Sequence, residues 1–470
     1  MENFFPVLVV INVIFFLYFV VVNGSYILLI LLSYFQTKRS REKVDIYELS
    51  GLFGTNLYRS VSILAPAYNE EANIIESTRA LLNLQFPDYE VIVINDGSTD
   101  STLEKLIDSF ELAEMDRHVP KSIDCKPIRR VYGSRKHPNL VVVDKENGRK
   151  ADALNAGINV SRKELFCAVD SDSLLEADVL KKMLISFMED DETIAVGGVV
   201  RVANGCTFRH GVVEKVETPK SFITRIQAVE YLRSFLFGRA GWDYFDCLLI
   251  ISGAFGIFDR EAVIRVGGYL HDTVGEDMEL VVRMHRFYRE NEIPYRIRFM
   301  PEPVCWTEVP DDWTTLSRQR NRWQRGLADT LMRHRVMLFR PRYGRLGFLA
   351  MPFFLFVELL SPIIELFGYI IFTVSLLLGA INFTFFMLYF IACVFLGVIM
   401  SVIAVLLEEM TMRRYDRMKD VLVLVIHAFL ENFGYRQLHA WWRFKGLIDY
   451  MKGRKEWGDM ARSGTLGNKA

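Results

Sequence analysis

The longest apolar stretches of the chain lie near its two ends. No charged residue occurs between Phe4 and Gln36, where most positions are Val, Ile, Leu, Phe or Tyr. This length exceeds the roughly 20 apolar residues that a helix needs to cross a bilayer. A cleaved signal peptide is the alternative, but such peptides usually begin with basic residues, and the only early charge here is Glu2. Residues 1–36 are therefore predicted to form a retained transmembrane anchor.

Two further apolar stretches predict a transmembrane hairpin over residues 346–407. The stretch from Leu346 to Gly379 is interrupted only by Glu358 and Glu365, and the stretch from Ile381 to Leu407 carries no charge. The two glutamates are seven residues apart and should share one helix face. Carboxylates at membrane depth usually line a polar path, unless they lie at the edge of the bilayer. Both interpretations of the pair remain open at this point.

Basic residues beside the apolar stretches predict the orientation in the membrane. Lys and Arg are frequent between Thr37 and Lys43 and again between Met410 and Lys419. Basic residues next to a span tend to stay in the cytoplasm. The amino terminus is therefore expected outside, and residues 44–345 inside, a bacterial-type inner or plasma membrane.

The segment of residues 408–450 allows two interpretations. It begins as a cytoplasmic loop, and from Val421 an apolar run contains His427 and Glu431 and then gives way to residues rich in Trp, Tyr and Arg. Such residues favour the headgroup region, so this run forms either an interfacial helix or a fourth span. Residues 451–470 are expected to be a polar tail.

Residues 44–345 have the pattern of a soluble α/β domain. Short runs rich in β-branched residues alternate with amphipathic ones. The predicted strands are Val61–Ala65, Tyr89–Asn95, Leu140–Val143 and Leu165–Val169. The predicted helices are Glu70–Leu84, Ser101–Phe110 and Ala151–Gly157. Such alternation is typical of parallel β-α-β units, in which ligands bind at the carboxyl ends of the strands.

Composition excludes several classes of protein. A length of 470 residues is too great for one compact domain. The net charge of −1 provides no general attraction for nucleic acid, so no nucleic-acid partner is expected. The six cysteines lie far apart in the sequence, which argues against a zinc site or a disulfide framework.

Acidic residues follow the predicted strands. Asp170 and Asp172 come directly after the fourth strand and should face the same side. Two carboxylates in this arrangement suit Mg²⁺ or Mn²⁺ bridging to substrate phosphates, although a solvated acidic turn is the alternative. Asp96 follows the second strand in an Asp-Gly pair, which is also a common turn signal. Glu276 and Asp277 precede the predicted helix Met278–Tyr288, where carboxylates either cap the helix or accept a proton from an attacking hydroxyl.

Two basic segments accompany these acids. Lys150 ends a Lys-Glu-Asn-Gly-Arg-Lys run before a predicted helix, where a cation and free backbone N–H groups can hold a diphosphate. The alternative is a basic surface loop. Gln319, Arg322 and Trp323 lie just before the apolar hairpin, where Arg can bind phosphate and Trp can stack on a ligand. A helix held by anionic lipid is the alternative there.

The order of these motifs between apolar stretches resembles that of membrane-embedded family 2 glycosyltransferases. The likeness is closest to processive polysaccharide synthases that make cellulose, hyaluronan or poly-N-acetylglucosamine, and it covers about residues 61–330. The resemblance implies a cytoplasmic GT-A domain, a Rossmann-like nucleotide-sugar fold, inserted between transmembrane and interfacial helices. It also implies metal-dependent transfer of a hexose, with inversion, from a UDP-sugar to a growing β-linked polysaccharide.

The resemblance also implies roles for individual residues. Those matching nucleotide-sugar contacts are Tyr68, Asn69, Glu70, Asp96, Lys150, Asp170, Gln319, Arg322 and Trp323. Asp172 matches the principal metal ligand, supported by Asp170, and the metal would be Mg²⁺ or Mn²⁺. Asp277 matches the general base, beside Glu276. Trp323 matches the acceptor site, and Ser252 and Gly253 match an acceptor-side loop more loosely. Many relatives have Thr-Glu-Asp at the base motif, whereas this chain has Gly275.

Three or four apolar segments are few for a chain that must export a polymer alone. A homo-oligomer or an export subunit would complete the path, or the product is a glycolipid or lipid-linked oligosaccharide made by single transfers. The expected partners are therefore a UDP-sugar, a glycan or lipid acceptor and membrane lipids. A receptor or scaffold with a degenerate catalytic domain is a third reading, against which the intact aspartates argue.

Overall fold

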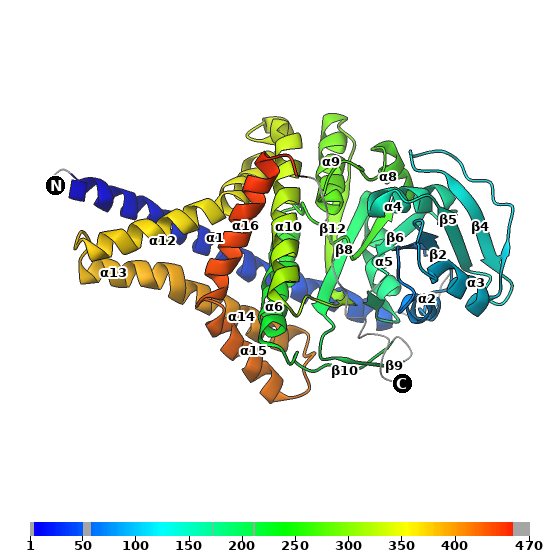
Figure 1. The fold of residues 1–470 in the computed structure, drawn as a ribbon, viewed down its shortest axis with the longest axis horizontal. Coiled ribbons are helices and arrows are strands. Elements are labelled where there is room, and N and C mark those ends of the chain that lie inside the picture. The colour runs from blue at the N-terminus through cyan, green and yellow to red at the C-terminus, as the bar shows by residue number, and fades with distance from the viewer. Residues whose placement is uncertain (1–3, 50–57, 172, 210–211, 455–470) are drawn as a thin grey trace.

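The computed structural model describes residues 4–49, 58–171, 173–209 and 212–454. The chain divides into an α/β domain, at the right of Figure 1, and a group of long apolar helices that extends to the left, of which the first, α1, runs from the left end of the molecule to the α/β domain. The predicted metal ligand Asp172 and most of the predicted tail fall outside the described residues.

In the described part of the chain, ten strands form one mixed sheet in the order β3-β4-β5-β2-β1-β6-β11-β8-β12-β7. The strands of this sheet are β1 Val61–Ala67, β2 Tyr89–Asn95, β3 Leu112–Glu114, β4 Ile128–Ser134, β5 Leu140–Lys145, β6 Leu165–Val169, β7 Leu174–Leu175, β8 Thr193–Val202, β11 Phe255–Asp259 and β12 Arg296–Thr307. A separate antiparallel pair is formed by β9 Thr207–Arg209 and β10 Val212–Lys215.

The helices that cover the sheet come mainly from the first two thirds of the chain. They are α2 Ile74–Leu82, α3 Thr102–Phe110, α4 Arg149–Val160, α5 Val179–Glu189, α6 Phe222–Tyr231, α7 Arg239–Tyr244, α8 Arg260–Arg265, α9 Glu276–Glu290 and α10 Trp313–Arg333. A π-helical segment, η2 Leu232–Gly238, joins α6 to α7. Apolar side chains are buried on both faces of the central strands, as expected for strands covered by helices on each side.

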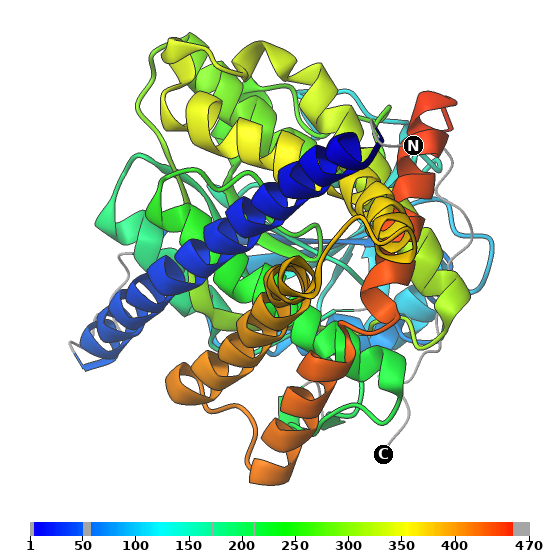
Figure 2. The same ribbon diagram turned by 90° about the vertical axis from the view of Figure 1, so that its left-hand side faces the viewer.

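The apolar helices form the other end of the molecule. They are α1 Phe4–Leu49, the bent pair η5–α11–η6 Leu346–Leu359 and α12 Ser361–Leu377, and the continuous run α13 Phe383–Phe390, η7 Ile391–Phe395 and α14 Leu396–Thr411. Within the described ranges, two helices are long and apolar enough to span a membrane, or three if the bent pair counts as one span. Figure 2 shows α1 crossing this end diagonally beside the other apolar helices.

Large apolar side chains remain exposed along α1. For example, Ile14 and Phe35 are 60% exposed and Val21 is 62% exposed. By contrast, the polar side chains of Asn12 and Asn23 are buried and donate to Ser375 Oγ and the Ala392 carbonyl at 2.7 Å. This pattern of apolar residues outside and polar residues inside suits a helix whose outer surface faces lipid.

Two buried ion pairs join the α/β domain to the apolar helices. Arg201 of β8 pairs with Glu408 of α14, and both side chains are at most 5% exposed. Arg233 of η2 pairs with Glu431, which is 1% exposed. Buried charges depend on their partners, because an unpaired charge in this environment costs several kcal/mol. The two parts of the molecule are therefore firmly attached.

The segment after residue 411 folds into two helices that lie against the domain. They are α15 Met418–Leu430 and α16 Tyr435–Met451. Neither is among the helices long and apolar enough to span a membrane in the described ranges. Along α16, Arg443 donates to Gln324 of α10 at 2.8 Å. This arrangement favours the interfacial interpretation of the segment.

The strands predicted from the hydrophobic pattern are confirmed, with β2 and β6 matching residue for residue. The expectation of parallel strands is confirmed for the four predicted strands, which lie in the order β5-β2-β1-β6. The strands that were not predicted on either side run the other way: β4 pairs antiparallel with β5, and β11 pairs antiparallel with β6 and β8. The helix predicted from Glu70 begins only at Ile74, since residues before it form a turn. Glu358 and Glu365 lie on two helices separated by a bend of 44°, and both side chains line the cavity described below.

Candidate active site

A single large cavity runs from the carboxyl ends of the central strands to the apolar helices. Its volume is about 1690 Å³. Every predicted site residue in the described part of the chain lines it, from Tyr68 and Asp96 at the strand ends to Trp323 on α10. Glu358 and Glu365 line its far end, together with Arg436 and Arg443. The structure thus brings together residues that are far apart in the sequence.

The loop after β1 is held against the loop after β2. Asn69 has φ of +55°, and its Oδ1 accepts from the Thr99 backbone N–H at 2.8 Å. The backbone N–H of Glu70 donates to Thr102 Oγ1 at 2.9 Å. Tyr68, by contrast, is half exposed at the cavity edge. Asn69 and Glu70 therefore shape this wall, and Tyr68 is the ring most accessible to a ligand.

Asp96 is the centre of a buried charge cluster. Its Oδ1 accepts from Lys145 Nζ at 2.7 Å and from the Gly148 N–H at 3.0 Å, and its Oδ2 accepts from the Arg149 N–H at 2.8 Å. Lys145 is fully buried and also pairs with Asp152 at 2.5 Å. Asp96 thereby fixes the basic loop in front of α4. The sequence identified Lys145 only as part of a basic run.

The turn at Gly97 explains how this loop can approach Asp96. Gly97 has φ of +67°, and a Cβ added there would lie 2.8 Å from the Asn147 backbone nitrogen. Only glycine provides both this conformation and this space. The Asp-Gly pair is therefore a turn, and its Asp96 also lines the cavity.

Lys150 lies in the first turn of α4, which begins at Arg149, two residues before the predicted start at Ala151. Its Nζ forms an ion pair with Asp170 and donates to the Gly253 carbonyl at 2.9 Å. Burial alone would lower the pKa of Lys150, but the carboxylates of Asp170, Glu276 and Asp277 outweigh it and the pKa is raised. The side chain therefore provides a fixed positive charge among three acids.

Asp277 and Glu276 open α9 on the opposite side of Lys150. Asp277 Oδ2 accepts from the Gly253 N–H at 3.1 Å, and its Oδ1 accepts from the Met278 N–H at 2.8 Å. Glu276 is buried, and burial together with the adjacent Asp277 raises its pKa to about 7. Gly253 thus connects the catalytic candidate Asp277 to Lys150 through its own peptide groups, while Ser252 Oγ accepts from the Ala254 N–H at 3.4 Å.

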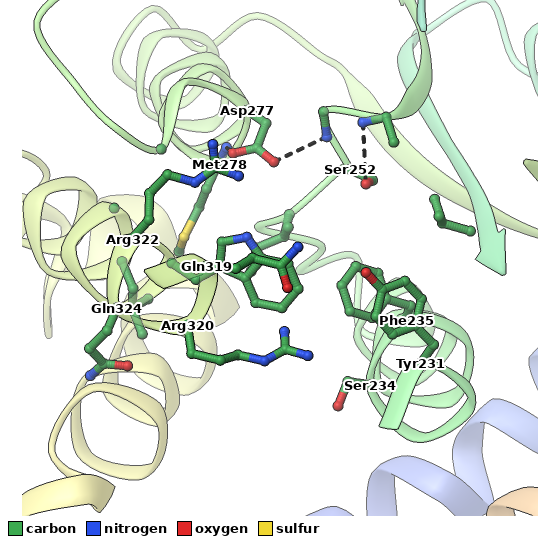
Figure 3. A pocket seen from close by; sticks show the side chains of 18 of the residues that line it. Tyr231, Ser234, Phe235, Ser252, Asp277, Met278, Gln319, Arg320, Arg322 and Gln324 are labelled. Carbon is green, nitrogen blue, oxygen red and sulfur yellow. Dashed lines mark hydrogen bonds between the residues drawn. The ribbon is translucent and has the colours of Figure 1, made fainter. Parts of the chain in front are cut away.

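Helix α10 presents the third set of candidates. Figure 3 shows the Arg322 side chain extending from α10 toward Asp277, with Gln319 and Arg320 along the same wall. The guanidinium of Arg320 lies 4.1 Å from the centre of the Trp323 ring, which itself lies 5.8 Å from the Phe235 ring. Gln319 Oε1 is buried without a hydrogen-bond partner among the described residues. An orphaned amide oxygen in a cavity wall suits a ligand that donates to it.

A close contact between two helices explains why this chain has Gly275 where many relatives have the threonine of a Thr-Glu-Asp pattern. A Cβ added at Gly275 would lie 2.8 Å from Gly326 Cα, and one added at Gly326 would lie 2.9 Å from Gly275 Cα. The start of α9 therefore contacts α10 backbone to backbone. This contact sets Asp277 next to the wall that carries Arg322.

The residues that the structure describes provide only part of a site for a divalent cation. No three His, Cys, Asp or Glu side chains converge as metal ligands in the described ranges. Asp170 nevertheless offers a carboxylate to the cavity, about 30% exposed, balanced by Lys150. Mg²⁺ and Mn²⁺ commonly need only one or two carboxylates when substrate phosphates complete the site. Asp170 and the neighbouring Asp172 satisfy that requirement in chemical type.

Sequence reasoning missed one wall of the cavity. Tyr231 and Phe235 stack at 4.3 Å, and the Arg239 guanidinium lies 4.2 Å from the centre of the Phe235 ring. All three line the cavity from one continuous helix. The sequence around them reads as an ordinary amphipathic helix, and no local signal distinguishes the π-helical turn.

An α/β sheet with acids and cations gathered at its strand ends, around a cavity of this size, is typical of enzymes that act on phosphate-containing substrates. The sequence comparisons specify the class. The chain belongs to the family 2 group of glycosyltransferases: Glycosyl transferase family group 2 matches residues 165–405, and Glycosyl transferase family 2 matches residues 62–266. The expected GT-A type of α/β domain between apolar helices is confirmed.

Curated relatives agree with this assignment. The chain is 27% identical over 300 residues to the probable glycosyltransferase YdaM of Bacillus subtilis, covering 63% of this chain and 61% of that protein. It is 27% identical over 274 residues to the poly-β-1,6-N-acetyl-D-glucosamine synthase of Staphylococcus epidermidis, covering 58% and 56%. The matches thus span about three fifths of the length of these relatives.

Among solved structures, the mannosyltransferase PcManGT from Pyrobaculum calidifontis, in complex with GDP-mannose and Mn²⁺, aligns with 94% of this chain and 99% of its own at 16% identity and a TM-score of 0.49. TarS residues 1–349 from S. aureus align with 84% of this chain and 92% of that one at 14% identity and a TM-score of 0.38.

Proposed function

We propose that this protein is an inverting glycosyltransferase that extends a β-linked polysaccharide from a UDP-sugar at the cytoplasmic face of a membrane. The observation that carries the proposal is the placement of Asp277. Its carboxylate is oriented by the Gly253 N–H, lies near Lys150 and Arg322, and opens onto a cavity that continues between the apolar helices. One carboxylate therefore lies between a phosphate-binding side and an acceptor side.

The donor would bind across the strand ends. Tyr68 and the wall built by Asp96 would receive the nucleoside, and Lys150 and Arg322 would contact the diphosphate. Arg matches phosphate oxygens with a planar fork, and a buried Lys supplies a compact charge. These cations would stabilise the negative charge that grows on the leaving diphosphate.

Asp277 would accept the proton of the acceptor hydroxyl. That hydroxyl attacks the anomeric carbon from the face opposite the diphosphate, so an α-linked donor yields a β-linkage. Burial beside Asp277 raises the pKa of Glu276 to about 7. Glu276 would support Asp277 from the adjacent position and would not itself act as the base. A positioned general base typically contributes about 10²–10⁴-fold in rate.

Mg²⁺ or Mn²⁺ would be held by Asp170 and Asp172 and would supply further neutralisation of the diphosphate. The contacts of Lys150 are relevant to this site, because its ion pair with Asp170 holds that carboxylate at the cavity wall. Trp323 and Gln319 would contact the acceptor end and the diphosphate from α10, and Ser252 and Gly253 would border the acceptor.

The polymer product and the membrane location rest on the far end of the cavity. Glu358, whose carboxylate accepts from Tyr26 at 2.5 Å, and Glu365 lie among helices with exposed apolar surfaces. Polar groups that line a cavity between such helices suit the passage or binding of a hydroxyl-rich chain. The Staphylococcus epidermidis relative named above is a poly-β-1,6-N-acetyl-D-glucosamine synthase, which favours UDP-N-acetylglucosamine as the first donor to test.

Product analysis tests this proposal. Purified protein in nanodiscs is incubated with Mg²⁺ or Mn²⁺ and radiolabelled UDP-glucose or UDP-N-acetylglucosamine, alongside Asp277→Asn and a matched control, Asp88→Asn. Asp88 is exposed and pairs with Lys163 outside the cavity. A long glycosidase-sensitive product from wild type and Asp88→Asn, lost in Asp277→Asn, is expected. A short organic-soluble product would replace polymerisation by glycolipid synthesis, and equal product from Asp277→Asn would refute the assigned base.

A further inference from the structure

One guanidinium in the cavity wall has no ion-pair or hydrogen-bond partner among the residues that the structure describes. Arg239 is 8% exposed, its Nη1 is buried without a hydrogen bond, and no ion pair joins it to any residue in the described ranges. The other buried arginines of this region are paired, Arg233 with Glu431 and Arg320 with Glu230 at 2.9 Å. Burying an unpaired charge is costly, so such a group is retained where a ligand completes it.

The helix that carries Arg239 arranges it as the end of a stack. Tyr231, Phe235 and Arg239 are spaced by four residues through the π-helical turn η2, so their side chains follow one another on one side of the helix. The Tyr231 and Phe235 rings are parallel within 16° at 4.3 Å, and the guanidinium lies 4.2 Å from the centre of the Phe235 ring. A guanidinium stacked on a ring is held in place, while its in-plane N–H groups remain free to donate. Figure 3 shows Tyr231 and Phe235 facing the cavity.

Arg239 lies on the side of Asp277 from which the acceptor would approach in the proposed reaction. Helix α7 packs against the membrane anchor, since a Cβ added at Gly241 would lie 2.6 Å from the Leu29 carbonyl. Arg239 therefore lies between the apolar helices and Asp277. Lys150 and its ion-pair partner Asp170, on the proposed donor side, lie on the other side of Asp277, at the strand ends. An acceptor hydroxyl that attacks opposite the diphosphate must come from the Arg239 side.

We propose that Arg239, held by the Tyr231–Phe235 stack, binds an sp² oxygen on the sugar residue at the acceptor end, namely an acyl carbonyl or a carboxylate. This inference rests on the function proposed above and adds a requirement on the acceptor. A guanidinium forms its strongest hydrogen bonds with such oxygens, whereas a hydroxyl oxygen is a weaker acceptor. A buried donor left unpaired by an acceptor without that oxygen would disfavour that acceptor. Asp277 is the closest source of opposite charge, and burial lowers the pKa of Arg239 to about 10.

Acceptor competition tests the proposal. Purified protein in nanodiscs receives UDP-N-acetylglucosamine and one of three soluble acceptors, with a terminal N-acetylglucosamine, glucuronate or glucose. Transfer is measured for wild type, Arg239→Met, Arg239→Lys and a control, Arg59→Met, in which the lost arginine pairs with Glu164 and Asp259 away from the cavity. Release of UDP without acceptor is recorded for each protein.

Wild type is expected to prefer one of the two acceptors with a carbonyl or carboxylate over the glucose acceptor, and which of the two leads identifies the source of the oxygen. Arg239→Met should raise the KM for that acceptor by about 10- to 100-fold, the range of a charge-assisted hydrogen bond. The KM for the glucose acceptor, the donor KM and UDP release should stay unchanged, and Arg239→Lys should recover part of the loss.

Three results would overturn the inference. Wild type could use all three acceptors equally, Arg239→Met could lose all three acceptors and UDP release together, or Arg59→Met could show the same acceptor-dependent loss. If Arg239→Met does not purify as a folded protein, Arg239→Lys alone must show the acceptor-dependent loss for the inference to stand. A wild-type protein that releases UDP from no donor would refute the proposed function itself, which separates the two failures.

Discussion

Restoring the common family residue at position 275 should damage this protein. Gly275 has a negative φ of −130°, so Gly275→Thr does not meet the left-handed strain that favours glycine. The obstacle is the neighbouring helix, because the new Cβ would lie 2.8 Å from Gly326 Cα and 3.2 Å from its carbonyl carbon. Carbon atoms in contact normally lie about 3.5–4.0 Å apart. In Gly275→Thr, the start of α9 and the middle of α10 must therefore move apart by about 1 Å.

This separation has two measurable costs. Overpacking of a tight contact typically lowers the free energy of unfolding by about 1–3 kcal/mol. Asp277 on α9 and Arg322 on α10 would also move apart, and a displacement of about 1 Å between catalytic groups can lower the rate by about 100-fold. The transfer rate is thus expected to fall more than donor binding, since Lys150 and Asp96 lie on other elements.

The assay compares Gly275→Thr and Gly275→Ala with Gly24→Ala in nanodiscs. An added Cβ at Gly24 has no heavy atom within 4 Å, which makes it a glycine control without a clash. Unfolding midpoints and initial rates of sugar transfer are measured for all three. Wild-type rate and wild-type midpoint in Gly275→Thr would show that α9 and α10 tolerate the extra group, and would refute the steric explanation of this glycine.

Three further variants test other contacts. Arg201→Met leaves Glu408 buried and unpaired, so the free energy of unfolding should fall by about 3–5 kcal/mol, measured by thermal unfolding in nanodiscs. Burial of His285 on α9 lowers its pKa from 6.5 to about 4. The free energy of unfolding should therefore be highest above pH 6.5 and should be about 2 kcal/mol lower at pH 5, because the unfolded chain binds the proton first. His285→Asn should abolish this pH dependence. Gly253→Ala places a Cβ 3.1 Å from Lys150 Nζ, so transfer should fall by about tenfold or more with little change in the unfolding midpoint.

Each of these has a contrary outcome. The double variant Arg201→Met with Glu408→Leu should recover much of the loss, and no recovery would mean that the ion pair is not the cause. A pH slope that persists in His285→Asn would assign it to another group. Full activity in Gly253→Ala would show that Lys150 does not need its present position.

The hydrophobic pattern was sufficient for the central strands and for the chemistry at their ends. Long runs of buried β-branched residues have few alternatives, and ligands at strand ends follow from the geometry of parallel sheets. The direction of the outer strands could not be predicted. β11 is as apolar as β6 yet runs antiparallel to it, because direction depends on the connection rather than on the strand sequence.

Side-chain partnerships were beyond the sequence as well. Asp96 could be recognised as a strand-end carboxylate, but its enclosure by Lys145 and the loop in front of α4 depends on a residue 49 positions later. Arg239 reads as a polar position in an amphipathic helix, and its lack of a partner emerges only when every neighbour is placed. The bend of 44° between the helices that carry Glu358 and Glu365 likewise leaves no signal in the spacing of the two residues.

The two buried ion pairs between the domain and the apolar helices also constrain how the enzyme can move. Because Arg201 and Arg233 lose their counter-charges if the domain tilts away from Glu408 and Glu431, rocking of the whole domain over the membrane carries a heavy electrostatic penalty. In the polymerisation proposed above, advance of the product by one sugar would then come from small displacements within the cavity wall. The helical base acts as a fixed frame, against which only the ligand and the side chains that grip it change position.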